Sequence, residues 1–328
     1  MARIAILGAA HIHTPNFVKT LAARRDHRTI AVYDDDFERA SRVAEILNAE
    51  PTTQLARALH ADVDAVVVCS ETLHHARLVA AACDARKHLF VEKPLGMNAT
   101  DALEMQQRID AAGVTFQTGF FMRSAPAHRF LKAEIDKGTF GRITHVRASN
   151  CHAGSLKGWF DQEWRWMADP AIAGVGAFGD LGAHVVDLLV WLLGPVARVT
   201  AEVRTATHRY GECDELGEGL LAFRNGTLGS IAAGWVDVAN PQTLLVSGTE
   251  GVAWVDKGKL YVSSEKLGAN GREPWTTLPE ALPHAFDQFL DALSGKEMPL
   301  IGAVEAAYGC RVVDAMYRAA NERRWVDL

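Results

Sequence analysis

Short apolar runs alternate with amphipathic stretches along the first 120 residues. Five such runs occur, at Ala2–Leu7, Thr29–Tyr33, Ala65–Cys69, His88–Val91 and Thr115–Thr118. Runs of this length predict strands that are buried on both faces of a parallel sheet. Apolar residues recur at helical spacing between the runs, as in Phe37–Leu47, His75–Ala85 and Thr100–Ala112. This alternation predicts an α/β domain with right-handed crossovers and a doubly wound parallel sheet.

The pattern changes after about Phe121. Helices are expected at Ala127–Lys137 and Asp180–Leu193, with a strand at Ile143–Ala148 between them. The strand patterns after Pro195 follow one another without intervening helices, at Val196–Arg204, Gly219–Phe223, Thr227–Ala233, Thr243–Gly248, Val252–Asp256 and Leu260–Ser263. Asn225-Gly226 lies between two of them and is a strong hairpin signal. Consecutive strands of this kind predict an α+β domain with a mainly antiparallel sheet.

Two helical patterns, at about Pro283–Leu293 and Ala303–Asn321, end the chain. We therefore divide the sequence into an α/β domain at residues 1–121 and an α+β domain at residues 122–328. The division leaves open that the last helix, residues 303–321, packs back on the first domain.

Composition narrows the classes of partner. The chain has 328 residues, 48% of them hydrophobic, and a net charge of −6, which disfavours nucleic acid or an anionic membrane as a partner. Its five cysteines are scattered and form no CxxC pair, which is typical of reduced thiols in the cytoplasm. The most apolar helical stretch, near Val185–Leu193, carries Asp187 and is too short to span a bilayer. We expect a cytoplasmic protein with no signal peptide and no membrane span.

The first strand ends in Gly8-Ala9-Ala10-His11-Ile12-His13. A dinucleotide-binding turn usually has the pattern GxGxxG or GxGxxA, of which only the first glycine is present here. The second strand ends in Asp34-Asp35-Asp36, where a carboxylate can accept the ribose hydroxyls of an adenosine. We predict that Gly8, Ala10, His11, Ile12 and Asp34 bind NAD. NADP is disfavoured, because three carboxylates would repel its 2′-phosphate; the alternative is an ordinary strand–turn–helix corner followed by solvated charges.

Two further segments carry candidate chemistry. Glu92-Lys93-Pro94 follows the fourth strand, so Lys93 faces the crevice where open α/β sheets bind ligands. Asp180, His184 and Asp187 share one face of an otherwise apolar helix. Buried carboxylates beside an imidazole predict either a general base or a satisfied structural network, and the helix alone does not separate the two.

A loop rich in tryptophan precedes that helix. It contains Trp159, Trp164, Arg165 and Trp166. Aromatic rings can stack on the apolar faces of a sugar, although a single tryptophan more often belongs to a core or an interface. We predict His152, Trp164 and Arg165 as substrate contacts.

Taken together, these segments resemble the Gfo/Idh/MocA oxidoreductases, the relatives of glucose-fructose oxidoreductase and inositol dehydrogenase. The resemblance rests on the Gly8 turn, on Glu92-Lys93-Pro94-Leu95-Gly96 and on Asp180-Leu-Gly182-Ala-His184-Val-Val-Asp187, with Gly119-Phe-Phe-Met-Arg123 and Gly141-Arg-Ile between them. It implies that Lys93, Asp180 and His184 form the catalytic set. It also implies a homodimer or homotetramer through the second-domain sheet.

The same resemblance extends the cofactor site. Aligning His75 with the family's histidine places Ser70-Glu71-Thr72 where the family usually has Thr-Pro-Asn beside the cofactor. Ser70, Glu71, His75, Glu92 and Lys93 are therefore expected near the dinucleotide. Arg123, at the end of the Gly119 segment, is expected to contact substrate together with Lys93, Asp180 and His184.

The sequence-based hypothesis is a dehydrogenase that transfers a hydride between NAD and a secondary alcohol or ketone of a sugar, polyol or related small molecule. His184 takes the hydroxyl proton, Lys93 bonds the same oxygen, and Asp180 orients the pair; which of Lys93 and His184 is the formal base stays open. This hypothesis assigns no metal. One alternative is a dinucleotide-binding sensor that has lost catalysis. A second is a metal-dependent hydrolase that uses His11 and His13, which the antiparallel pattern of the second half opposes.

Overall fold

The computed structural model describes all residues, Met1–Leu328. The chain forms two compact units. The first comprises Met1–Phe120, Phe160–Gly174 and Pro283–Cys310, and the second comprises Phe121–Trp159, Val175–Leu282 and Arg311–Leu328. The division made from the sequence differs, because it assigned all of 122–328 to the second domain.

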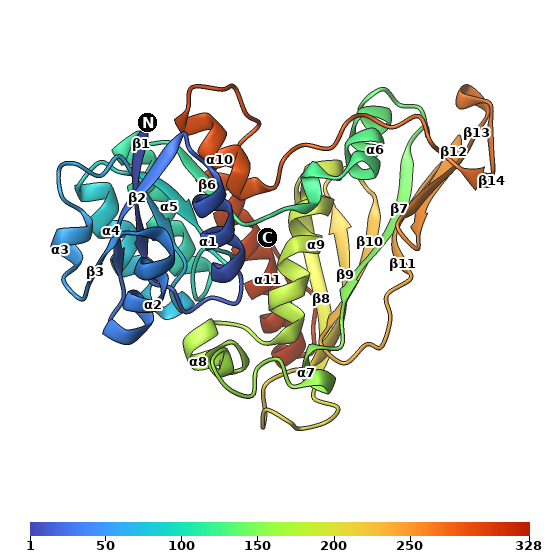
Figure 1. Cartoon of the computed structure of the whole chain (residues 1–328). Coiled ribbons are helices and arrows are strands. Elements are labelled where there is room, and N and C mark those ends of the chain that lie inside the picture. Colours follow the sequence, from blue (N-terminus) through green and yellow to red (C-terminus); the bar gives the residue numbers. More distant parts are fainter. The chain divides into compact units, whose positions relative to one another are not determined.

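A six-stranded parallel sheet forms the centre of the first unit (Figure 1). Its strands are β1 (Ala2–Leu7), β2 (His27–Tyr33), β3 (Glu50–Thr52), β4 (Ala65–Val68), β5 (His88–Val91) and β6 (Phe116–Thr118), in the order β3-β2-β1-β4-β5-β6. This order is that of a dinucleotide-binding doubly wound sheet, in which ligands bind where the order reverses, beside β1 and β4. The predicted fold class of this region is confirmed.

Alternate residues of each strand face opposite cores. Ile4 and Ile6 pack with α1 (Thr14–Ala23), α2 (Phe37–Leu47) and α10 (Ala285–Leu293). Ala5 and Leu7 pack in the other core, to which α3 (Leu55–Ala58), α4 (His75–Asp84), α5 (Ala99–Ala112) and the start of α11 (Ala303–Glu322) contribute. Because both faces are covered, the strands are continuously apolar, as the sequence pattern predicted.

Helix ends in this unit follow local chemistry. Asp36 caps α2 by accepting the N–H groups of Glu38 and Arg39, and Asn98 caps α5 in the same way. Gly113 ends α5 in the left-handed conformation. The sequence analysis missed β3, because a three-residue edge strand that contains Pro51 has no periodicity to detect.

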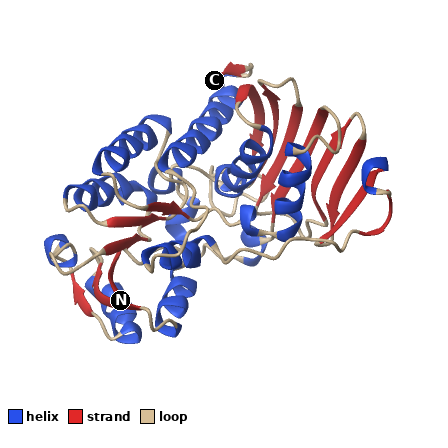
Figure 2. Ribbon diagram, turned by 90° about the horizontal axis from the view of Figure 1, so that it is seen from above, coloured by secondary structure: helices blue, strands red, loops and turns tan.

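A nine-stranded sheet forms most of the second unit. Figure 2 shows its strands side by side as one continuous sheet. They are β7 (Ile143–Cys151), β8 (Val196–Arg204), β9 (Leu216–Phe223), β10 (Leu228–Gly234), β11 (Gln242–Gly248), β12 (Gly251–Asp256), β13 (Lys259–Ser264), β14 (Ala269–Pro274) and β15 (Val326–Asp327). The order is β14-β13-β12-β11-β7-β10-β9-β8-β15, and every neighbouring pair is antiparallel except β7 and β10. The prediction of a mainly antiparallel sheet is confirmed, whereas the short or polar edge strands β14 and β15 were not predicted.

The second unit contains three further helices. They are α6 (Pro126–Asp136), α7 (Gly154–Lys157) and α9 (Ala177–Leu193), while the short α8 (Pro170–Ala173) belongs to the first unit. Strands β9 and β10 form the hairpin that was predicted at Asn225-Gly226. In this turn only Gly226 has a positive φ, of 87°. The N–H of Phe223 donates to the carbonyl of Thr227, and the N–H of Gly226 donates to the carbonyl of Phe223. The loop is therefore the longer type that ends in a left-handed glycine.

Helix α9 packs on one face of this sheet, against β7, β9 and β10. The stretch Pro170–Leu193 is long and apolar enough to cross a membrane, but 83% of its most apolar window is buried inside the protein. The apolar stretch expected from the sequence, near Val185–Leu193, was shorter, because that expectation did not include the helical turn that begins at Pro170. Burial assigns the apolar side chains of α9 to the protein core.

We expect Gly8→Ala to lower the free energy of unfolding by at least about 3 kcal/mol. Gly8 has a φ of +80°, and a Cβ there would lie 2.4 Å from the Cβ and 2.6 Å from the Cα of Ser70. Gly113→Ala is the matched control, since its φ is +63° but a Cβ added there would meet nothing within 4 Å. The control should lose about 1 kcal/mol. Equal losses in urea unfolding would show that contact with Ser70 is unimportant.

Candidate functional site

The turn after β1 brings the first loop close to the loop after β4. The N–H of Gly8 donates to the carbonyl of Tyr33 at 2.7 Å, and the N–H of His11 donates to the carbonyl of Cys69 at 3.0 Å. Gly8 lies so close to Ser70 that no side chain fits between them. The first glycine of the incomplete fingerprint therefore keeps its structural role.

Helix α1 begins directly after this loop. Pro15 lies in its first turn, which contains no acidic residue, and no side chain caps the helix. The hydrogen bonds of the loop leave the N–H groups of Ala10 and Ile12 unused. Unused N–H groups and the positive end of a helix dipole are the elements of a phosphate site.

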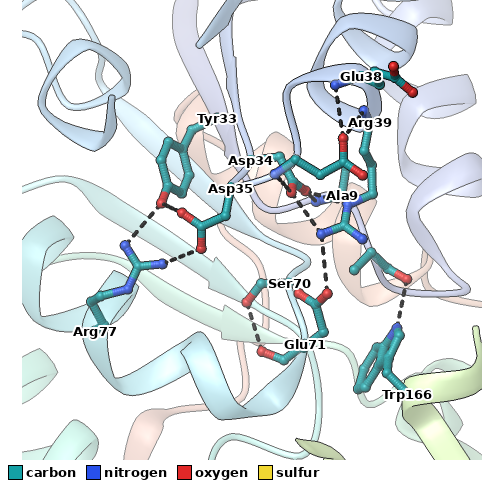
Figure 3. Close-up of polar contacts among 12 residues, drawn as sticks. Ala9, Tyr33, Asp34, Asp35, Glu38, Arg39, Ser70, Glu71, Arg77 and Trp166 are labelled. Atoms are coloured by element: carbon teal, nitrogen blue, oxygen red, sulfur yellow. Dashed lines mark hydrogen bonds and ion pairs between the residues drawn. The ribbon is translucent and has the colours of Figure 1, made fainter. Parts of the chain in front are cut away.

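A buried carboxylate holds the same loop from the side of β2. One oxygen of Asp34 accepts the N–H of Ala9 at 2.8 Å and Nε of Arg39 at 2.8 Å. The other accepts the N–H of Asp36 at 2.9 Å and Nη2 of Arg39 at 2.7 Å (Figure 3). Four donors use the full accepting capacity of the carboxylate. Asp34 therefore has a structural role in this structure, in contrast to the prediction that it accepts ribose hydroxyls.

Other charges surround this pair. Glu71 accepts Nη2 of Arg39 at 3.2 Å, and the hydroxyl of Ser70 donates to the carbonyl of Glu71 at 3.0 Å. Asp35 pairs with Arg77 at 2.9 Å and accepts the hydroxyl of Tyr33 (Figure 3). The side chain of Asp35 is 57% exposed, so it is the accessible carboxylate beside Asp34. Neither arginine was predicted as a partner. Arg77 is 42 residues from Asp35, so only the fold brings α4 to this carboxylate, whereas Arg39 follows Asp34 by five residues and reaches it from the first turn of α2.

Glu92 is fully buried at the end of β5. Nδ1 of His13 donates to its Oε1 at 3.0 Å, and the N–H of Lys93 donates to its Oε2 at 2.8 Å. Burial alone would raise the pKa of Glu92, but the nearby imidazoles of His13 and His11 and the Lys93 ammonium hold that pKa well below its ordinary value of 4.5. A carboxyl with a lowered pKa stabilises the fold above that ordinary value, and this contribution is lost as the pH falls through the lowered pKa.

The predicted residues near Glu92 have different surroundings. His75 is fully buried, and its Nδ1 donates to the carbonyl of Leu95 at 3.1 Å. Burial lowers the pKa of His75, so it is a neutral support of the segment after Lys93. Lys93 is 2% exposed. The ring of His13 points out of the α1–β1 packing contact toward Glu92, and 37% of it remains exposed.

The polar side chains of α9 have different partners. Asp187 forms a bidentate ion pair with Arg123, with distances of 2.9 Å to Nε and 2.6 Å to Nη2. Asp180 accepts the indole N–H of Trp235 at 3.1 Å. His184 is 3% exposed, with its ring 4.8 Å from that of Phe121. Arg123 was predicted to contact substrate. In the structure its guanidinium pairs with Asp187 and holds α9 in place.

The tryptophan-rich loop is divided between the two units. His152 and Trp159 belong to the second unit, with their rings 4.7 Å apart. Trp164, Arg165 and Trp166 belong to the first.

In the first unit, the indole N–H of Trp166 donates to the carbonyl of Ala10 at 3.1 Å (Figure 3), and Nη1 of Arg165 donates to the carbonyl of Ala168 at 3.0 Å. Trp164 lines a largely apolar cavity of about 610 Å³ together with Ala9, His11 and residues of α1 and α2. Trp166 therefore contacts the first loop, a role that the sequence analysis did not predict for it.

Arg39→Ala should lower the free energy of unfolding by about 2 kcal/mol, because it removes two charge-assisted hydrogen bonds from the buried Asp34. Arg42→Ala is the matched control: Arg42 is an exposed arginine of the same helix. Urea unfolding at neutral pH measures both. A loss no larger for Arg39→Ala than for the control would contradict the structural role of the pair.

Comparison with known proteins identifies related domains for both units. Residues 2–120 match the oxidoreductase family with an NAD-binding Rossmann fold, and residues 128–254 match the GFO/IDH/MocA C-terminal domain. The myo-inositol 2-dehydrogenase of Thermotoga maritima is 30% identical over 70% of this chain and 67% of its own length. The levoglucosan dehydrogenase of Pseudarthrobacter phenanthrenivorans is 29% identical over 52% of this chain, and the match spans about half, 49%, of that relative.

A solved structure agrees in fold. A levoglucosan dehydrogenase in complex with NADH and L-sorbose superimposes with a TM-score of 0.85 over 100% of this chain and 98% of that one, at 20% identity. Two matching domains in the expected order, together with the inositol dehydrogenase relative, confirm the resemblance noted in the sequence. The chain belongs to the Gfo/Idh/MocA family of NAD-binding oxidoreductases.

Proposed function

We propose that this protein is an NAD-dependent dehydrogenase that oxidises a secondary alcohol of a sugar or polyol, or reduces the corresponding ketone. The observation that carries the proposal is the first loop: Gly8 packs against Ser70 without room for a Cβ, and two N–H groups are unused before α1. The relatives named for inositol and levoglucosan support a polyhydroxylated substrate.

The loop fits a dinucleotide in spite of its incomplete fingerprint. Ala10 adds only a methyl group where the pattern has its second glycine, and His13 is turned toward Glu92. The N–H groups of Ala10 and Ile12 would bind the phosphates. Asp35 would accept a ribose hydroxyl, since the oxygens of Asp34 are in use.

Charge favours NAD over NADP. Asp34, Asp35, Asp36 and Glu71 lie around this end of β2, against the guanidinium groups of Arg39, Arg42 and Arg77. The carboxylate in excess would repel a 2′-phosphate by about 1 kcal/mol at contact distance in water.

The chain's own residues supply proton handling. NAD, when bound, supplies the hydride acceptor. Buried His184 would receive the proton of the substrate hydroxyl, and Lys93 would donate a hydrogen bond to the same oxygen. Asp180, held by Trp235, would orient His184. His152, Trp164 and Arg165 are proposed to contact the rest of the substrate.

A turnover screen of sugars and polyols with NAD and with NADP tests the activity. We expect absorbance at 340 nm to rise with at least one polyhydroxylated substrate, and faster with NAD. NAD binding without turnover on any sugar, polyol or sugar acid would instead favour the sensor alternative, which the incomplete glycine fingerprint motivates.

Lys93→Met and His184→Asn should each lower kcat by about 100-fold or more, as expected for loss of a positioned acid–base group. Affinity for NAD, measured by calorimetry, should change little for His184→Asn. Lys259→Met and His60→Asn, at exposed positions, are the matched controls and should retain normal turnover. Near-normal kcat in both active-site variants would contradict the proposed roles.

We also propose a homodimer or homotetramer formed through the face of the second sheet that α9 does not cover. Leu220 and Leu228 are 49% and 60% exposed, and their cross-strand neighbours on this face are Ser230 and Ala222. Apolar side chains on an open sheet face favour burial against a second copy. Cytoplasmic localisation is proposed as well, in keeping with five free cysteines.

The double substitution Leu220→Glu and Leu228→Glu should convert the assembly to smaller species, because it would bury four carboxylates in each symmetric contact. Light scattering at micromolar concentration measures the mass. Val238→Glu, at a loop position that is 90% exposed, should leave the mass unchanged. A wild-type monomer would refute the proposed assembly.

A further inference from the structure

The segment His11-Ile12-His13 carries two imidazoles that hydride transfer does not require. The fold adds a third group to them. Glu92, from the end of β5, lies with these two histidines so that one ligand atom from each falls within 4.8 Å of the others. Only the convergence of the carboxyl ends of β1 and β5 creates this set, since 79 residues separate His13 from Glu92.

The cluster is rigid on two sides and accessible on the third. His11 and Glu92 are 3% and 0% exposed. Nδ1 of His11 accepts the N–H of His13 at 3.2 Å, and the two rings pack edge to face with centroids 4.7 Å apart. His13, whose side chain is 37% exposed, opens the cluster to solvent.

The donor set suits a transition-metal ion. Two imidazoles and one carboxylate are a common set for zinc in sites that keep a further coordination position open. Ligand atoms around tetrahedral zinc lie about 3.4 Å apart. Nδ1 of His13 and Oε1 of Glu92 are 3.0 Å apart, which is close to this spacing.

The buried carboxylate supplies the electrostatic reason. A fully buried carboxylate is stable only beside positive charge. In the structure the half-exposed imidazole of His13 faces Glu92, and a divalent cation between the two would serve the same need with greater charge. The hydrogen bond from the N–H of Lys93 holds the second oxygen of Glu92 and fixes the direction of the first.

We propose that His11, His13 and Glu92 form a binding site for one divalent transition-metal ion of the zinc class, on the loop between β1 and α1. The site shares the loop between β1 and α1 with the proposed NAD contacts His11 and Ile12, so its test uses the protein without NAD. The main sequence-based hypothesis assigned no metal, and its hydrolase alternative named His11 and His13 without Glu92. The fourth position would be open to water or to an anionic oxygen.

Zinc titration of the full chain, after removal of metal with a chelator, tests the proposal by calorimetry without NAD. Cobalt(II) serves as a second probe, since its visible absorption reports on coordination. We expect one zinc ion per chain and a cobalt spectrum with nitrogen and oxygen ligands. Loss of a ligand in His13→Ala should weaken zinc binding by about tenfold or more.

His60→Ala is the matched control, because His60 is exposed and lies beside a carboxylate, Asp62, without a third ligand. It should bind zinc as the wild type does. His13 is the exposed member of the cluster, so His13→Ala is expected to fold, and circular dichroism verifies this before titration. Absence of zinc binding at millimolar concentration, or equal affinity in His13→Ala and wild type, would overturn the site.

Discussion

The buried carboxylate of Asp34 holds the nucleotide-binding unit in its working geometry. It accepts a backbone N–H from the loop after β1, another from the turn after β2, and two bonds from Arg39 of α2. One charge therefore joins the loop after β1, 25 residues away in sequence, to the segment that connects β2 with α2. Because a buried carboxylate must keep all of its donors, the positions of these segments are coupled.

The loop after β1 tolerates its incomplete glycine pattern because only one position requires glycine. Glycine is required at Gly8, where the backbone turns with positive φ against Ser70. The later positions have different solutions: Ala10 remains small, and His13 leaves the packing contact by bonding to Glu92. The changes that weaken the fingerprint thus create a cluster of His11, His13 and Glu92 that a glycine-rich loop would not have.

In helix α9, buried polar side chains are satisfied by partners inside an apolar core. The bidentate pair of Asp187 with Arg123 compensates one buried charge, and the indole of Trp235 satisfies part of Asp180. These contacts fix the orientation of the helix from two ends. His184 lies between them on the same face, so its ring is positioned by the packing of a rigid helix.

The sequence by itself determined most of the strand and helix pattern of both units, because apolar periodicity reports which faces are buried; the edge strands β3, β14 and β15 lack that periodicity. It also identified Lys93, Asp180 and His184 as the chemical candidates, through motifs in which residue type and spacing coincide. Tertiary structure alone decided which charges neutralise one another. Arg77 pairs with Asp35, Arg123 pairs with Asp187, and His13 pairs with Glu92. Pairing of this kind depends on distances between elements far apart in sequence, and a linear pattern carries no information about those distances.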